Sequence, residues 1–211
     1  MLHCPAVIEW NERNLFDIVM NKIAVKRLLA LSLLVLLPNL ASAHILPGTS
    51  HGFQDGLMHP LTGWDHLLAM FAVGLWAAQQ RGRAIWQIPL VFVSVMALGG
   101  ILGVTGIYMP GAELAIAISV LALGGLIATK TSFAPTLSMM VVGAFALFHG
   151  YAHGHEMPAS ASALPFSIGF VISTVTLHGL GIGAGLGLRN QPRAMRLAGA
   201  TIAACGLCLL A

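Results

Sequence analysis

Long apolar stretches separated by short polar turns dominate the pattern of the chain. After an apolar run near residues 28–37, six further stretches have the length and hydrophobicity of membrane helices. We expect these helices near residues 57–79, 86–108, 112–129, 134–153, 163–188 and 194–211. The pattern therefore predicts an all-α fold, a polytopic membrane helical bundle with about six transmembrane helices.

The composition agrees with a membrane protein. Hydrophobic residues make up 57% of the 211 residues and charged residues only 8%, so polar groups could not cover the apolar surface of a soluble domain. The basic residues are scattered over short loops and form no patch, so we expect the lipid bilayer, and not a nucleic acid, as a partner. Three cysteines, Cys4, Cys205 and Cys208, provide no disulfide framework.

The segment before the six stretches has the features of a secretory signal peptide. Residues 1–19 are polar and irregular, which suggests a mis-assigned extension or a disordered segment. Residues 20–43 combine a basic beginning, a ten-residue apolar run and the small-residue cleavage sequence Ala41-Ser42-Ala43. The alternative, an uncleaved first helix, fits the short apolar run less well. We therefore expect residues 44–211 to form the mature six-helix membrane domain.

The distribution of charge predicts the orientation of the helices. Every lysine and arginine after residue 43 falls at alternate connections, namely Arg81, Arg83, Lys130, Arg189, Arg193 and Arg196. Basic connections stay in the cytoplasm, and Asp55, Glu113 and Glu156 lie at the opposite ends of the stretches. The mature N-terminus and the C-terminus are thus predicted on the periplasmic side of the bacterial inner membrane.

A first cluster of metal-ligand residue types, in segment 59–66, opens the first stretch. We expect Pro60 in the first helical turn, where its missing N–H has no cost. His59 and His66 would then lie about two turns apart on one helix face. Asp65 would lie in hydrocarbon, which costs roughly 2.5 kcal/mol or more unless it faces a partner, an ion or water.

A second cluster lies at the outward end of the fourth stretch. His149 and His153 are four residues apart and hence on one helix face, and Glu156 joins them if the helix continues past Gly154. Gly154 and the following Pro158 favour fraying there instead. His155 is a weaker candidate in the same segment.

A third candidate, His178, lies deep in the fifth stretch. With His44 and His51 outside the membrane, the histidines form a descending series that resembles a metal route. For His178, a neutral histidine bonded to a neighbouring helix is an equally good interpretation. A cleaved N-terminus at His44 could also chelate an arriving ion.

These residue types suit a borderline divalent cation such as Ni²⁺, Co²⁺ or Zn²⁺. Because methionine is a ligand for copper, the methionines of the chain leave copper as an alternative ion. We expect the ion to be cargo, with no permanently bound cofactor. Two small-residue faces, Gly99-x-x-x-Gly103 and the glycines from Gly179 to Gly187, predict close helix packing and would permit a homo-oligomer.

The two clusters resemble the signatures of the HupE/UreJ family of nickel/cobalt permeases. The first is His59-Pro60-x-x-Gly63-x-Asp65-His66, and the second is His149-x-x-x-His153-Gly154-x-Glu156-x-Pro158. The resemblance covers the mature chain and implies inward transport of Ni²⁺ or Co²⁺ for the maturation of hydrogenase or urease. It also implies a metal-handling role for six residues: His59, Asp65, His66, His149, His153 and Glu156.

Two other functions are compatible with the same residues. An intramembrane hydrolase could hold zinc with three histidines and Asp65, but the ligands are spread in depth and no separate acid or base stands out. A structural membrane subunit would tolerate replacement of the histidines. We predict a permease and not an enzyme.

Overall fold

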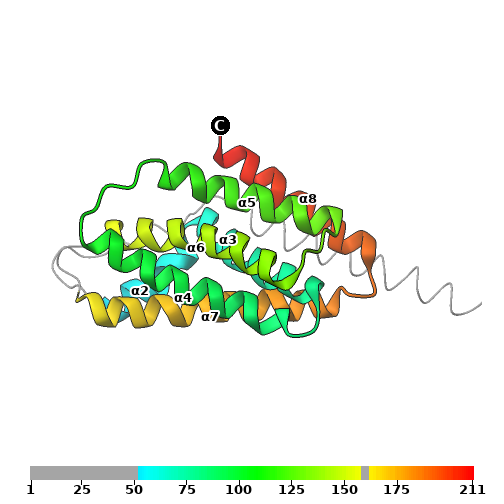
Figure 1. The fold of residues 1–211 in the computed structure, drawn as a ribbon, viewed down its shortest axis with the longest axis horizontal. Helices are drawn as coiled ribbons and strands as arrows, with labels where there is room; N and C mark the ends of the chain where they lie inside the picture. The colour runs from blue at the N-terminus through cyan, green and yellow to red at the C-terminus, as the bar shows by residue number, and fades with distance from the viewer. Residues whose placement is uncertain (1–51, 158–161) are drawn as a thin grey trace, which may run out of the picture. The chain divides into compact units, whose positions relative to one another are not determined.

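The described part of the structure is entirely helical. The computed structural model describes residues 52–157 and 162–211, and its helices are shown in Figure 1. They are α2 (Gly52–Thr62), α3 (Trp64–Gln80), α4 (Ala84–Val104), α5 (Ala112–Thr129), α6 (Pro135–Glu156), α7 (Ala163–Gly187) and α8 (Pro192–Leu209). The all-α prediction is confirmed for these residues. The predicted extension, the signal peptide, His44 and His51 lie outside the described residues.

Four of the helices have the length and composition of membrane spans: α4, α5, α6 and α7. The other three described helices fall short of such a span for simple reasons. Helices α2 and α3 have only 11 and 17 residues, and α8 carries Arg193 and Arg196 near its beginning, which lowers its hydropathy. The chain is therefore a membrane protein with four clear spans among its described residues.

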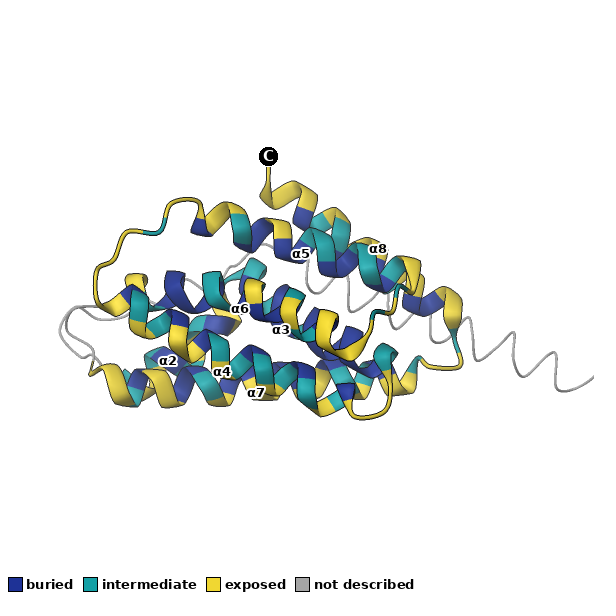
Figure 2. Cartoon of the chain, viewed as in Figure 1, coloured by how far each residue is buried: buried dark blue, intermediate teal, exposed yellow. Residues whose placement is uncertain are grey.

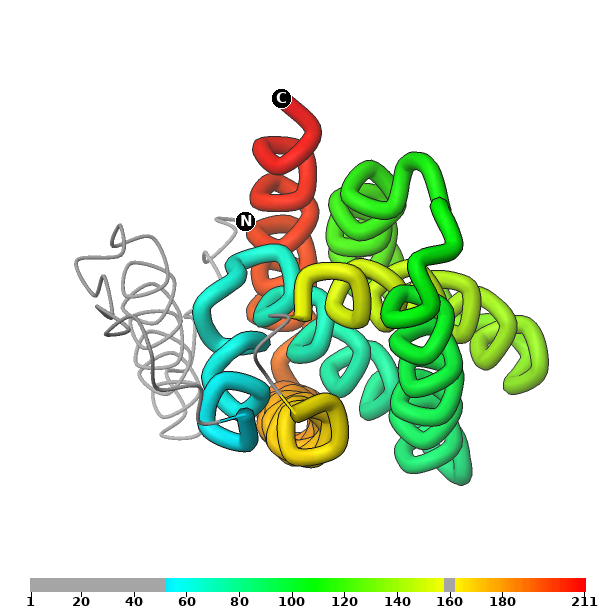
Figure 3. Tube along the Cα trace, turned by 90° about the vertical axis from the view of Figure 1, so that its left-hand side faces the viewer, coloured from blue at the N-terminus to red at the C-terminus, as the bar shows by residue number. Residues whose placement is uncertain are grey.

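Helix α3 is the central helix of the bundle. Its side chains are buried from Leu68 to Ala78 with one half-buried exception, as the dark band along α3 in Figure 2 shows. It packs against α7, α5 and α4, while α4 pairs with α6 and α5 with α8. Figure 3 shows the α5–α8 pair beside the remaining helices. Residues on α3 are thus well placed to meet residues from several other helices.

The predicted glycine faces are only partly correct. On α4, a side chain at Gly99 or Gly103 would collide with the backbone of α6, so this face does allow a close approach. On α7, a side chain at Gly181 would collide with the backbone of α3, and one at Gly185 would collide with the side chain of Ala78 on α3. Gly179, Gly183 and Gly187 instead point into open space, and the expectation of close packing is wrong for them within the described residues.

The prediction of one continuous first helix is also wrong. Pro60 lies near the end of α2 and not in the first turn of a helix. The chain breaks at Gly63, whose backbone is extended, and α3 begins at Trp64. Asp65 explains the new start, because its carboxylate lies in the first turn of α3 and accepts a hydrogen bond from the backbone N–H of His66 at 2.8 Å.

The basic connections gather at one end of the bundle, as the charge pattern predicts. Arg81, Lys130 and Arg189 come from three different connections and line one cavity of about 340 Å³. Two glutamine side chains at the end of α3 donate hydrogen bonds to carbonyl groups of Ile127 and Thr131 nearby. Since His66 lies at the opposite end of α3, the basic end and the histidine-rich end are well separated.

Candidate metal centre

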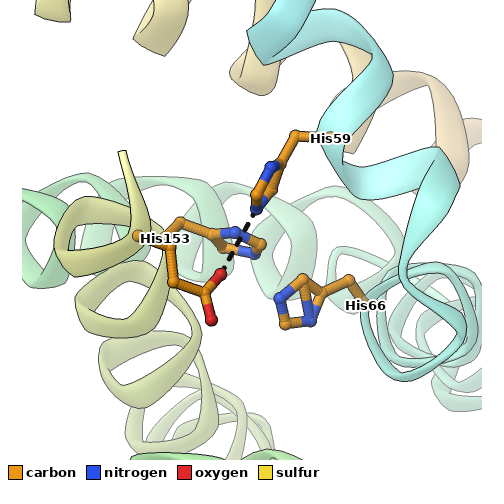
Figure 4. Close-up of side chains that lie close together, drawn as sticks. His59, His66 and His153 are labelled. Carbon is orange, nitrogen blue, oxygen red and sulfur yellow. Dashed lines mark ion pairs between the residues drawn. The ribbon is translucent and has the colours of Figure 1, made fainter. Parts of the chain in front are cut away.

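Three histidines and one carboxylate from three helices meet at the histidine-rich end of the bundle. His59 comes from α2, His66 from α3, and His153 and Glu156 from α6. One potential ligand atom from each of these four residues lies within 4.8 Å of the others. Figure 4 shows the side chains of His59, His66 and His153 converging on one region. His59 Nε2 lies 3.5 Å from Glu156 Oε2, the contact marked by the dashed line.

Two local features of the backbone bring these side chains together. The break at Gly63 turns α3 away from α2, so that His59 and His66 approach the same point from two helices and not from one face. Helix α6 continues through Glu156, so the fraying expected at Gly154 does not occur and His153 and Glu156 are stacked on one face. The cluster therefore depends on the helix break at Gly63 and on the continuation of α6 past Gly154.

Aromatic rings surround the cluster on its α7 side. The ring centres of His66 and His153 are 3.9 Å apart, and those of His59 and His153 are 4.8 Å apart. Phe170 lies 4.1 Å from the His153 ring, and Phe166 lies 5.7 Å from the His59 ring. These phenyl rings pack against the imidazoles on the side of the cluster that faces α7.

Several buried nitrogens of the cluster have no hydrogen-bond partner among the described residues. They are Nδ1 of His66 and both ring nitrogens of His153. His66 Nδ1 lies 3.4 Å from Asp65 Oδ1 but makes no hydrogen bond with it. A buried polar atom without a partner costs about 1–3 kcal/mol, so the cluster would gain considerably from a ligand that accepts nitrogen lone pairs.

The spacing of the four ligand atoms is close to that of a coordinated ion. Two ligand atoms that each lie about 2.1 Å from one ion are roughly 3.4 Å apart at the tetrahedral angle and about 4.2 Å apart on opposite sides of the ion. The four atoms lie within 4.8 Å of one another, so the widest pair would have to approach by roughly 0.6–1.4 Å to share an ion. Small side-chain rotations would therefore let a single divalent cation contact three imidazoles and one carboxylate.

The other predicted residues lie around this cluster. Asp65 is not one of the four, and its carboxylate supports His66 from the side, as described above. His149 is also outside the four, although its ring centre is 5.6 Å from that of His66. His155 is exposed and stacks on Tyr151 with ring centres 5.8 Å apart, so it points away from the cluster. His178 lies deeper, against Phe92.

Two residues near the site were not identified from the sequence as functional candidates. Glu113, at the start of α5, lies at the same end of the bundle as Glu156 and Asp65, and its charge interacts with theirs. Phe92 on α4 packs against both His149 and His178, with ring centres 5.7 and 5.1 Å apart. A phenylalanine in an apolar helix gives no sequence signal, whereas Glu113 was used only as a marker of topology.

A cavity gives the cluster additional space on the side of α4 and α7. Its volume is about 410 Å³, and His153 is one of its lining residues. Most of the other lining residues are apolar or glycine, including Met96, Gly100, Gly150 and Phe170. The polar cluster thus lies beside a largely apolar cavity formed by α4, α6 and α7.

Comparison with known proteins relates these motifs to one family. The family model described as HupE / UreJ protein matches residues 31–209. Protein HupE of Rhizobium leguminosarum bv. viciae is 45% identical over 178 residues, which are 82% of this chain and 92% of that protein. No solved structure matches the chain.

Proposed function

The chain belongs to the HupE/UreJ family, and we propose that it is a secondary permease that carries Ni²⁺, or Co²⁺, from the periplasm to the cytoplasm. The family consists of transport proteins and not enzymes, and it is associated with nickel and cobalt transport for hydrogenase and urease. The observation that carries the proposal is the meeting of His59, His66, His153 and Glu156 from three helices. In this role the four residues are the first binding site on the transport route.

The composition of the site supports weak, reversible binding of a divalent cation. Imidazole nitrogen suits Ni²⁺ and Co²⁺, and a single carboxylate neutralises only half of the ion's charge. Conduction requires an ion to enter and also to leave. Glu156, whose side chain is 45% exposed, lies at the entrance, while His153 is buried and leads inward. Asp65 assists by holding His66 and adding negative charge beside it.

The membrane potential provides sufficient driving force for this transport. It favours inward movement by roughly 2.3 kcal/mol per charge per 100 mV, hence by about 4.6 kcal/mol for a dipositive ion. Facilitated diffusion without a coupling ion is therefore our proposal. Loss of uptake on collapse of the pH gradient alone, with the potential maintained, would contradict it.

The orientation in the proposal follows from the two charged ends. The basic end with Arg81, Lys130 and Arg189 faces the cytoplasm, and the histidine-rich end faces the periplasm. Helices α3 and α8 complete six spans in the inner membrane, with the mature N-terminus and the C-terminus periplasmic. A cleaved signal peptide at residues 20–43 agrees with this topology. The open glycines on α7 leave room for a second copy of the chain.

Uptake of radioactive nickel by a transport-deficient host tests the function. We expect the parent to accumulate nickel and His153→Ala to lose at least about tenfold in uptake, because one ligand of the site is removed. His155→Ala is the matched control, since this exposed neighbour lies outside the cluster and should transport like the parent. Equal uptake by the two variants at equal membrane levels, or no uptake by the parent, would contradict the proposal. Competition by unlabelled Co²⁺ or Zn²⁺ measures selectivity.

A further inference from the structure

A second group of buried polar side chains lies further inside the bundle than the four-residue cluster. It consists of His149 on α6 with His178 and Thr174 on α7. All three residues are buried, with exposed fractions of 0% for His149, 2% for His178 and 0% for Thr174. Within the described residues, His149 Nε2, both ring nitrogens of His178 and Thr174 Oγ1 have no hydrogen-bond partner.

His149 is held in a form that leaves one nitrogen ready to bind a cation. Its Nδ1 lies 2.9 Å from the carbonyl oxygen of Phe145, one turn earlier on the same helix. A carbonyl can only accept a hydrogen bond, so Nδ1 carries the proton and Nε2 carries the lone pair. The same arrangement orients metal-ligating histidines in general. His149 is outside the four-residue cluster, so the lone pair on its Nε2 is available to bind an ion at a different position.

Phe92 packs against both His149 and His178. Its ring centre is 5.7 Å from that of His149 and 5.1 Å from that of His178. The two imidazole centres are therefore no more than 10.8 Å apart, the sum of these distances. Since His149 is also 5.6 Å from His66 by ring centres, consecutive histidines lead from the four-residue cluster toward His178.

Helix α7 places Thr174 and His178 directly inward of the cluster. Phe170, Thr174 and His178 are spaced by four residues and share one helix face. Phe170 contacts His153, and His178 is eight residues further along, or about 12 Å deeper. The hydroxyl of nearby Thr176 donates to the carbonyl of Ile172, the usual arrangement for threonine in a membrane helix, whereas that of Thr174 does not. Thr174 thus keeps its oxygen free on the face it shares with His178.

We propose that His149, His178 and Thr174 form a second, inner binding station for a divalent transition-metal cation. The ion leaves the four-residue cluster by way of His149 Nε2 and is then bound by His178 together with the Thr174 hydroxyl. Nitrogen ligands with a neutral oxygen, and no carboxylate, bind a dipositive ion more weakly than the outer cluster does, which favours onward release. The inference rests on the proposed permease function and adds a second step to it.

Substitution of His178 by glutamine separates this role from a structural one. Glutamine keeps a hydrogen-bonding side chain but replaces the imidazole ligand. We expect His178→Gln to bind nickel at the outer cluster, as measured by titration of the purified protein with Ni²⁺, and to lose at least about tenfold in the maximal rate of nickel uptake. Nickel binding and an uptake rate equal to those of the parent would overturn the inner station, although the permease function would stand. Absence of uptake in the parent would instead refute the permease function itself.

A pair of threonine variants keeps the test valid if the His178 variant fails to fold. Thr174→Val removes the unpartnered hydroxyl from a buried position with little change of shape. Thr176→Val, two residues away, removes a hydroxyl that bonds only to its own helix. We expect a several-fold lower rate of nickel uptake for Thr174→Val and the parental rate for Thr176→Val. Equal rates for the two variants at equal membrane levels would overturn the proposal.

Discussion

Gly74 provides a test of whether the close approach of α3 and α7 positions the histidines. A methyl group at Gly74 would collide with the backbone carbonyl of His178 and come within 3.0 Å of the backbone nitrogen of Ile182. Because both contacts are with backbone, rotation of a side chain cannot relieve them, and Gly74→Ala must push the two helices apart. Gly183→Ala is the matched control, since no atom lies within 4 Å of a methyl group there.

The expected free energies of unfolding differ in sign for the two variants. Overpacking of a buried site costs about 1–3 kcal/mol, whereas glycine to alanine in a helix gains about 1 kcal/mol. Because the collision at Gly74 is with backbone, its cost lies near the upper end of that range, so Gly74→Ala should lose about 2 kcal/mol, whereas Gly183→Ala should be neutral or gain up to about 1 kcal/mol. For a chain of this size, 1 kcal/mol corresponds to a change in melting temperature of about 2–4 °C.

Thermal unfolding of both variants in the same detergent, followed by circular dichroism, measures this difference. We also expect Gly74→Ala to transport less nickel per folded molecule, because His178 moves with α7 and His66 with α3. Equal melting temperatures for the two variants would refute the argument that the α3–α7 contact has no room for a side chain.

Three further substitutions have specific expected outcomes. Glu156→Gln removes the carboxylate near His59 and should weaken nickel binding about tenfold, or by about 1.4 kcal/mol; an unchanged titration would exclude this carboxylate as a ligand. Tyr151→Phe removes the hydroxyl that accepts a hydrogen bond from the backbone N–H of Met109 at 2.9 Å. The free energy of unfolding should therefore fall by about 1 kcal/mol, as measured by thermal unfolding. Nickel uptake should stay at the parental rate. Asp65→Asn keeps an oxygen that can accept the backbone hydrogen bond but removes the charge, so lower uptake with an unchanged melting temperature is expected; parental uptake would show that the charge is unnecessary.

The sequence predicted most of the helices because long apolar stretches have few alternatives in a membrane protein. The stretch expected at 134–153 is α6, and the stretch expected at 163–188 is α7, with bounds that differ by a few residues. The failure came at 57–79, where Pro60 was placed in the first turn of a helix. Gly63 followed by an acidic residue in the next turn was the better signal for a helix start, and the structure has α3 begin there.

The membership of the site could be predicted only in part. His59, His66, His153 and Glu156 were identified by residue type and spacing, and the structure brings them together. Their convergence from three helices could not be inferred from spacing, because it depends on the break at Gly63 and on tertiary packing. The packing of Phe92 against both His149 and His178 is likewise a result of the contact between helices and has no sequence pattern of its own.

Nickel flux into sealed proteoliposomes tests the central claim most directly. The purified chain is reconstituted with a metal-sensitive dye inside, and a potassium gradient with valinomycin sets an inside-negative potential. We expect Ni²⁺ or Co²⁺ to enter at a rate that rises with the potential, to enter at the same rate with His155→Ala, and to remain outside with His66→Ala. No flux above that of protein-free liposomes, or equal flux for the parent and His66→Ala, would contradict transport through the histidine cluster.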